Sequence, residues 1–176
     1  MTTQIDSNWK RIAGMHITEA GDIAVVWMAY DKLTDTIHIY NSELFRHQPW
    51  PVVGDGITCV GRWIPIAWCE KQKLTAEQLR LRGCNLIDPL KEDETLAEVN
   101  QREVHTRYLT GRLKVGRNLA NWHDEFKTYY RDKTKVPIDS HPLMAATRYA
   151  VAQLSWAKAQ KLSTRQQRNY PQAAII

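Results

Sequence analysis

The sequence has few cysteines and lacks the long apolar runs of membrane proteins. Its three cysteines, Cys59, Cys69 and Cys84, form no CxxC pair and match no zinc-binding spacing, so we interpret them as ordinary thiols in a reducing compartment. No apolar run approaches the roughly 20 residues that a membrane helix requires. The N-terminal MTTQIDSNWKR contains no apolar signal core. We therefore expect a soluble intracellular protein with no membrane partner.

Motifs of nucleotide hydrolysis and of nucleophilic catalysis are also absent. The segment GITCVGRW (Gly56–Trp63) has the first spacing of a phosphate-binding loop but lacks the Lys and Ser/Thr that complete it. There is no G-x-S-x-G and no HExxH, and the six histidines are scattered. Any ATPase motor that acts with this chain should therefore be a separate polypeptide.

The charge of the chain is unevenly distributed. Of its 176 residues, 43% are hydrophobic and 24% charged, which is typical of one globular domain. The net charge of +5 lies entirely after residue 140, where there are five basic residues and no acid: Arg148, Lys158, Lys161, Arg165 and Arg168. Such an end can contact phosphate or can simply be a solvated tail. We predict an extension at 1–9, a domain at 10–160 and a flexible tail at 161–176.

Hydrophobic periodicity predicts an α/β fold with a mixed sheet. Strands at 11–18, 22–30 and 36–40, joined by short turns, form an antiparallel ribbon. Shorter strands are expected at 62–68, 84–87 and 112–115, alternating with helices at 75–82 and 95–110 and followed by helices from 118 and at 142–161. The helix at 95–110 should turn Leu96, Val99, Val104 and Leu109 inward. Two prolines and three glycines at 47–61 predict a short or broken helix there.

The stretch KVPIDSHPLMAATRYAVAQL (Lys135–Leu154) contains the most suggestive junction. An extended segment ends near Asp139, and a helix begins at Pro142, which suits a first helical turn. An acid at a strand-to-helix junction is a plausible metal ligand. Asp139 or Ser140 can equally serve only as the helix cap.

An antiparallel ribbon continued by parallel strands and helices is the layout of an RNase H-like fold. Three segments, TGRLKV (110–115), LANWHDEFKTYYRD (119–132) and LMAATRYAV (143–151), resemble the C-terminal nuclease domain of the large terminase subunit of tailed bacteriophages. RIAGMHITEAGDIAVVWMAYD (11–31) and WIPIAW (63–68) are similar to the first and middle strands of that domain. The resemblance covers roughly residues 9–156. It implies an RNase H-like fold, a nuclease of viral DNA packaging in the bacterial host cytoplasm, and two Mg²⁺ or Mn²⁺ ions.

The sequence departs from the terminase pattern where that pattern carries its metal-binding acids. The first-strand aspartate is replaced by His16, and the run after the middle strand is Trp68-Cys69-Glu70-Lys71. At the late helix the family positions hold His141, Pro142 and Ala145, with only Asp139 nearby. The resemblance thus leaves His16, Glu70 and Asp139 as the metal ligands if a metal is bound. Two carboxylates and one imidazole suit Mg²⁺ poorly.

Two hypotheses follow from the resemblance and its departures. The first is an inactive or weakened nuclease fold that binds double-stranded DNA, a terminase subunit or another packaging protein, with phosphate contacts from Arg112, Lys114, Arg117, Arg148 and the basic tail. The alternative is an active two-metal endonuclease that cuts viral DNA during packaging. Its displaced acids would be Glu70 and Asp139 as catalytic residues, or Glu19 and Asp22.

Overall fold

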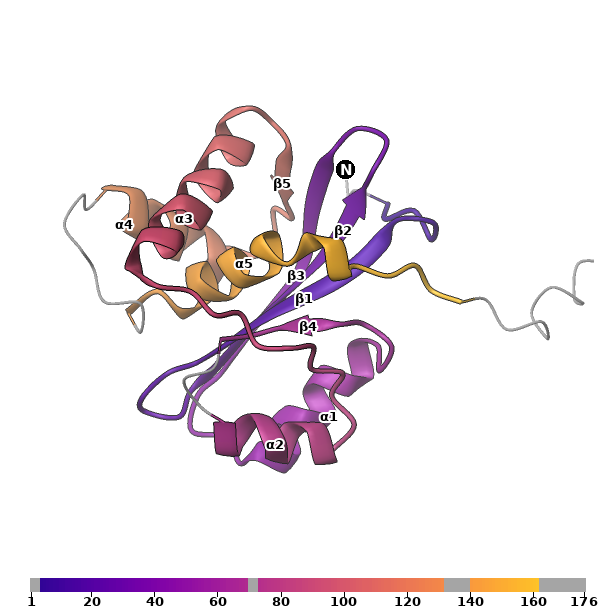
Figure 1. Ribbon diagram of the computed structural model, residues 1–176, viewed down its shortest axis with the longest axis vertical. Coiled ribbons are helices and arrows are strands. Elements are labelled where there is room, and N and C mark those ends of the chain that lie inside the picture. The colour runs from indigo at the N-terminus through magenta and orange to yellow at the C-terminus, as the bar shows by residue number, and fades with distance from the viewer. Residues whose placement is uncertain (1–3, 70–72, 132–139, 162–176) are drawn as a thin grey trace, which may run out of the picture.

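The centre of the protein is a five-stranded mixed sheet (Figure 1). This computed structural model describes residues 4–69, 73–131 and 140–161. Strands β1 (Lys10–Ile17), β2 (Ile23–Asp31) and β3 (Thr36–Phe45) are consecutive and antiparallel. β4 (Ile66–Ala67) pairs in parallel with β1, and β5 (Leu113–Val115) pairs in parallel with β3, giving the order β4-β1-β2-β3-β5. The predicted antiparallel ribbon continued by parallel strands is confirmed.

Helices cover both faces of this sheet (Figure 1). α3 (Glu94–Leu109), α4 (Ala120–Arg131) and α5 (Pro142–Ala152) pack on one face, and α1 (Trp50–Val60) and α2 (Lys73–Leu81) on the other. Side chains alternate between the faces along a strand, so Ile12 joins the α5 side while Ala13 and Met15 join the α1 side. Within the described ranges, no helix is long and apolar enough to cross a membrane.

α5 makes its closest approach to the sheet at Gly14 of β1. A Cβ atom at this position would lie 1.8 Å from the carbonyl oxygen of Ala146 and 3.1 Å from the Cβ of Ala150. Both alanines are completely buried. Only glycine lets the strand backbone and the helix backbone come this close, so Gly14 sets the depth at which α5 lies on the sheet.

The expectation of a short or broken helix at 47–61 was wrong, because α1 is a regular helix of 11 residues. Pro49 occupies the N-cap and Pro51 the first turn, where a helix needs no backbone donor. Gly54 and Gly56 lie where a Cβ would come within 2.6 and 2.8 Å of neighbouring side-chain atoms. Close tertiary packing explains these glycines, and it offsets their low helix propensity.

Two predicted strands are shorter than expected. The strand at 62–68 is reduced to the two residues of β4, and 84–87 contributes a single parallel bridge between Ile66 and Leu86. Pro65 lies directly before β4, and its carbonyl still accepts a hydrogen bond from the amide of Ala13 at 2.8 Å. Pro65 has no amide hydrogen to extend the ladder.

The final helix is also shorter than the predicted 142–161. α5 ends at Ala152, a 3₁₀ turn follows at Leu154–Trp156, and Lys158 then pairs in antiparallel fashion with Arg11 of β1. After the helix, Lys158 exchanges backbone hydrogen bonds with Arg11, on the edge of β1 that β4 does not reach. The predicted boundaries at 9–10 and 160–161 remain predictions, and 162–176 lie outside the described residues.

α3 turns a different face inward from the one that its apolar residues predicted. Val104 is buried as expected, but Leu96, Val99 and Leu109 are 39%, 51% and 69% exposed. The other buried positions of α3 are polar, Gln101 and Arg107. Both side chains have hydrogen-bond partners inside the protein, and this lets polar groups take positions that the apolar pattern had assigned to leucine and valine.

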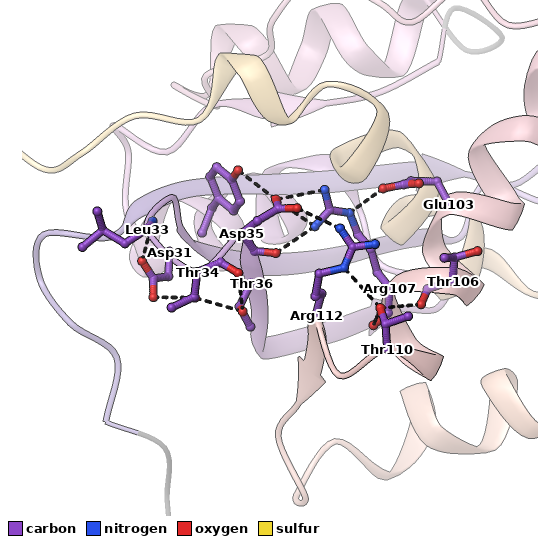
Figure 2. Close-up of polar contacts among 11 residues, drawn as sticks. Asp31, Leu33, Thr34, Asp35, Thr36, Glu103, Thr106, Arg107, Thr110 and Arg112 are labelled. Carbon is purple, nitrogen blue, oxygen red and sulfur yellow. Dashed lines mark hydrogen bonds and ion pairs between the residues drawn. The ribbon is translucent and has the colours of Figure 1, made fainter.

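A polar cluster ties the turn between β2 and β3 to α3 and β5, as Figure 2 shows. The Asp35 carboxylate accepts hydrogen bonds from the Tyr30 hydroxyl at 3.0 Å, from Arg107 at 3.1 Å and from Arg112 at 2.9 Å. Arg107 is only 10% exposed and also donates to Glu103 at 2.7 Å. The two guanidinium groups and two carboxylates balance in charge and fix the turn.

We expect Gly14→Ala to lower the free energy of unfolding by about 3 kcal/mol or more, because backbone must move against backbone to admit the new methyl group. Urea denaturation followed by circular dichroism measures this change. Gly116→Ala is the matched control, because its nearest neighbour is the movable side chain of Asn118 at 3.0 Å. An equal effect of both substitutions would contradict the role given to Gly14.

Candidate functional site

The candidate site lies at the carboxyl ends of β1 and β4, where the terminase resemblance places metal-binding acids. Ala13 pairs with Ile66 and Gly14 with Ala67, and the same register continued places His16 beside Cys69. Cys69 also forms a parallel bridge with Leu90, which brings the segment leading to α3 to the same edge. α5 crosses over these strand ends (Figure 1).

Side chains other than carboxylates fill the position between β1 and α5. Nδ1 of His16 lies 3.1 Å from the hydroxyl oxygen of Tyr149, and these side chains are 5% and 1% exposed. Burial raises the pKa of Tyr149, and a hydrogen bond with the Cys69 side chain raises it further, so the phenol stays protonated near neutral pH. An imidazole, a phenol and a thiol thus meet where carboxylates were expected.

A buried ion pair lies beside the cluster of His16, Tyr149 and Cys69. Nη2 of Arg148 is 2.5 Å from Oε1 of Glu92, and each side chain is 4% exposed. The other carboxylate oxygen of Glu92 accepts a hydrogen bond from Asn100 at 2.9 Å. The Arg148 guanidinium lies 5.3 Å from the ring centroid of Tyr149, so the ion pair and this cluster are adjacent. The carboxylate of Glu92 is therefore already balanced by an internal cation.

The described residues of this edge do not fit two divalent ions. Two such ions bring four positive charges and require several carboxylates with oxygen atoms free to coordinate. Among the described residues, Glu92 and Glu125 are carboxylates that bond to α5. Both oxygens of Glu92 are engaged, and Oε2 of Glu125 accepts two backbone hydrogen bonds from the start of the helix. Among the described residues, no group of three His, Cys, Asp or Glu side chains is placed to hold a metal ion.

Glu125 of α4 caps the start of α5. Its Oε2 accepts hydrogen bonds from the backbone amides of Leu143 at 2.9 Å and Met144 at 3.2 Å. Burial raises the pKa of Glu125 to about 7, against the opposing effect of the two amide hydrogen bonds. His141 occupies the N-cap position and makes no side-chain capping bond. Glu125 therefore caps the start of α5 from another helix, and the capping role expected of Asp139 remains a prediction because Asp139 lies outside the described residues.

The structure places only some of the residues named as candidate ligands. His16 and His141 are buried, and His141 packs edge-on against Tyr129 with ring centroids 5.4 Å apart. Glu70 and Asp139 lie outside the described residues, so their roles remain predictions. Glu19 is exposed beyond the end of β1.

The four predicted phosphate contacts fall into three different environments. Lys114 and Arg117 are exposed on and after the edge strand β5. Arg112 is 38% exposed and is already bonded to Asp35 (Figure 2). Arg148 is buried against Glu92, so a phosphate could reach it only if that ion pair opened. Lys114 and Arg117 are the two with side chains open to solvent.

Sequence reasoning missed three groups of this site. Glu92 belongs to the charged run KEDE, which reads as a solvated turn, and Glu125 belongs to an amphipathic helix. Cys69 was interpreted as an ordinary thiol. The departure from the family pattern at Cys69 was a usable signal. The contact of Cys69 with Tyr149 and the ion pair of Glu92 with Arg148 depend on how α5 crosses the sheet.

We expect Arg148→Met to lower the free energy of unfolding by about 3–5 kcal/mol, because it leaves the Glu92 carboxylate buried without a counter-charge. The double variant Arg148→Met/Glu92→Gln should recover most of this loss, since it removes both charges together. Urea denaturation at pH 7 measures both. Arg102→Met removes an exposed partner of Glu98, and this control should change little. A loss for Arg148→Met no larger than for the control would contradict the assignment.

Comparison with known proteins identifies the fold. Neither protein-family models nor curated proteins match the sequence. Among solved structures, the nuclease domain of the P22 large terminase matches with a TM-score of 0.77 at 17% identity, over 90% of this chain and 88% of that domain. The large-terminase nuclease domain of bacteriophage SPP1, solved with bound Mn, matches with a TM-score of 0.67 at 20% identity, over 85% of this chain and 88% of that one.

A longer protein matches in the same way. The large terminase of the thermophilic bacteriophage D6E matches with a TM-score of 0.65 at 12% identity, over 89% of this chain but only 43% of the D6E protein. These likenesses cover nearly all of the chain at low identity. The protein therefore has the RNase H-like fold of large-terminase nuclease domains, as the sequence resemblance had implied.

Proposed function

We propose that this protein is a homologue of the terminase nuclease domain that serves viral DNA packaging as an inactive or weakened nuclease, and that it acts by binding DNA. The observation that carries the proposal is the charge balance at the carboxyl ends of β1 and β4. His16, Tyr149 and Cys69 place an imidazole, a phenol and a thiol there in place of carboxylates, and Arg148 neutralises Glu92. Such a site provides few of the carboxylate oxygens that divalent ions need as ligands.

The buried ion pair supports inactivity more strongly than a missing acid alone would. A carboxylate with a solvated partner could exchange that partner for a metal at little cost. Glu92 and Arg148 are both nearly excluded from water, so separating them leaves two desolvated charges. A metal that binds Glu92 would have to displace the guanidinium of Arg148. Among the described residues, Arg148 forms an ion pair with no other carboxylate.

DNA is the favoured partner because cations are exposed at the edge of the sheet. Lys114 lies on β5 and Arg117 directly after it, and neither forms an ion pair with a described residue. The D6E large terminase has been solved in complex with ADP, which supports a role in a packaging machine that binds nucleotide. A terminase subunit or another packaging protein is the second possible partner.

The alternative, an active two-metal endonuclease, rests on Glu70 and Asp139. The SPP1 domain with bound Mn supports divalent metal use by this fold. In this chain, those two acids would have to supply the carboxylates that the described part of the site does not offer.

We expect the protein to leave supercoiled plasmid intact in Mg²⁺ and in Mn²⁺, to the same extent as the variant Glu70→Ala/Asp139→Ala. Gel electrophoresis measures nicked and linear products, and circular dichroism confirms that both proteins are folded. A metal-dependent nuclease in parallel reactions shows that the assay detects cleavage. Cleavage by the unmodified protein that the double variant abolishes would overturn the proposal and establish the alternative.

We expect duplex DNA to bind with an affinity that falls as salt rises, and Lys114→Ala/Arg117→Ala to reduce the slope of log K against log salt by about 1.8, since each phosphate contact contributes about 0.9. Fluorescence anisotropy with a labelled duplex measures the slope. Lys91→Ala/Lys127→Ala removes the same charge from exposed positions elsewhere and should leave the slope nearly unchanged. Affinity that does not depend on salt would contradict DNA binding and favour a protein partner.

A further inference from the structure

A row of basic side chains crosses the sheet at the end opposite His16. Lys158 pairs with Arg11, Arg11 with Ala29, Ala29 with His38, and His38 with Lys114. Residues paired directly across neighbouring strands point to the same face of a sheet. Four strand spacings of about 4.8 Å give this row a length of about 19 Å. The row therefore carries three cations and an imidazole on one face.

Aromatic side chains lie within this row. The Trp9 ring stacks on the imidazole of His38, with centroids 4.5 Å apart and planes 18° from parallel. The guanidinium of Arg11 lies over the ring of Tyr40, 5.5 Å from its centroid. Trp9 is half-buried, whereas His38 beneath it is 7% exposed, so the indole is the outer layer of the stack.

The helices on this face stop short of the row. The apolar cluster under α1 and α2 begins at Ala13 on β1 and ends at Trp27 on β2. Arg11 and Ala29 lie one step beyond these residues on the same face. In Figure 1 the turn between β2 and β3 extends away from α1 and α2. At this end of the face, the Trp9 ring lies on His38 and the Arg11 guanidinium lies over Tyr40.

The charges facing the row favour an anionic ligand. Lys114 and Lys158 are exposed. Arg11 is partly engaged, because it donates to the carbonyl of Asp6 at 3.0 Å. Burial lowers the pKa of His38, as does the nearby Lys114, against a weaker opposite effect of Asp31. Among the described residues, Asp6 acts on Arg11 and Asp31 on His38, and the row itself contains no acid.

We propose that this row, consisting of Trp9, Arg11, His38, Lys114 and Lys158, binds a single-stranded segment of polynucleotide, with phosphates on the two lysines and an unpaired base on the Trp9 indole. Aromatic rings stack on unpaired bases in a manner that tolerates any sequence, whereas the bases of a duplex are stacked on each other. The inference deepens the proposed function and rests on it, because it assigns part of the DNA-binding surface and the form of DNA that this part recognises.

The charge of the row is tested with Lys114→Gln/Lys158→Gln, measured by anisotropy with a labelled single strand of mixed sequence and with its duplex. The slope of log K against log salt for the single strand should fall by about 1.4, since each contact to a single strand contributes about 0.7. Lys91→Gln/Lys127→Gln is the control with the same charge change at exposed positions outside the row. An equal effect of the control would mean that only net charge matters, and would overturn the assignment.

The role of Trp9 is tested with Trp9→Leu, which keeps an apolar cover on His38 but cannot stack on a base. Affinity for the single strand should fall about tenfold, while affinity for the duplex should be nearly unchanged. Trp9→Phe should restore most of the binding. Equal losses for both forms of DNA, or no loss for either, would overturn the stacking role.

The two proposals fail in different ways. If the unmodified protein binds neither single-stranded nor duplex DNA, the DNA-binding function fails and this inference fails with it. If the protein binds DNA and the Lys114/Lys158 and Trp9 variants bind equally well, only the assignment to this row fails. Circular dichroism of each variant verifies that a loss of binding is not a loss of fold.

Discussion

The close contact between α5 and β1 at Gly14 is the constraint on which the rest of the structure depends. Because the strand has no Cβ there, the helix backbone at Ala146 lies directly on the strand. This depth brings Tyr149, one turn further along α5, to the imidazole of His16. The neighbouring residue Arg148 then points toward Glu92, so one backbone contact fixes both parts of the candidate site.

Charge balance gives this edge of the sheet a character different from that of a metal centre. A site for divalent ions keeps surplus carboxylates together, and their repulsion is relieved only when the metal binds. Here an imidazole, a phenol and a thiol stand in place of carboxylates, and Glu92 is paired with Arg148 within the protein. Arg148, and not a metal ion, balances the charge of Glu92 at this edge. This is the physical basis for proposing that the chain binds DNA and cuts it weakly or not at all.

The two ends of the sheet differ in the same physical terms. At the carboxyl end of β1, polar groups are buried under α5, where His16 contacts Tyr149 and Arg148 pairs with Glu92. At its amino end, α1 and α2 no longer cover the face, and the basic and aromatic side chains of the row around His38 lie at or near the surface. Asp35 anchors the adjacent turn through Arg107 and Arg112 (Figure 2), so this end has a fixed shape.

The sequence by itself determined the order of strands and helices, the mixed sheet and the absence of acids at the expected positions, because alternation, turn residues and motif spacing are local properties. Only the tertiary structure decided which groups replaced those acids, since His16, Glu92 and Arg148 are far apart in the chain and meet through the crossing of α5. It also decided that α1 is a regular helix despite its glycines, and that α3 buries Gln101 and Arg107 in place of Leu96 and Val99. Partners distant in sequence overrode local preference at each of these positions, and local pattern carries no information about such partners.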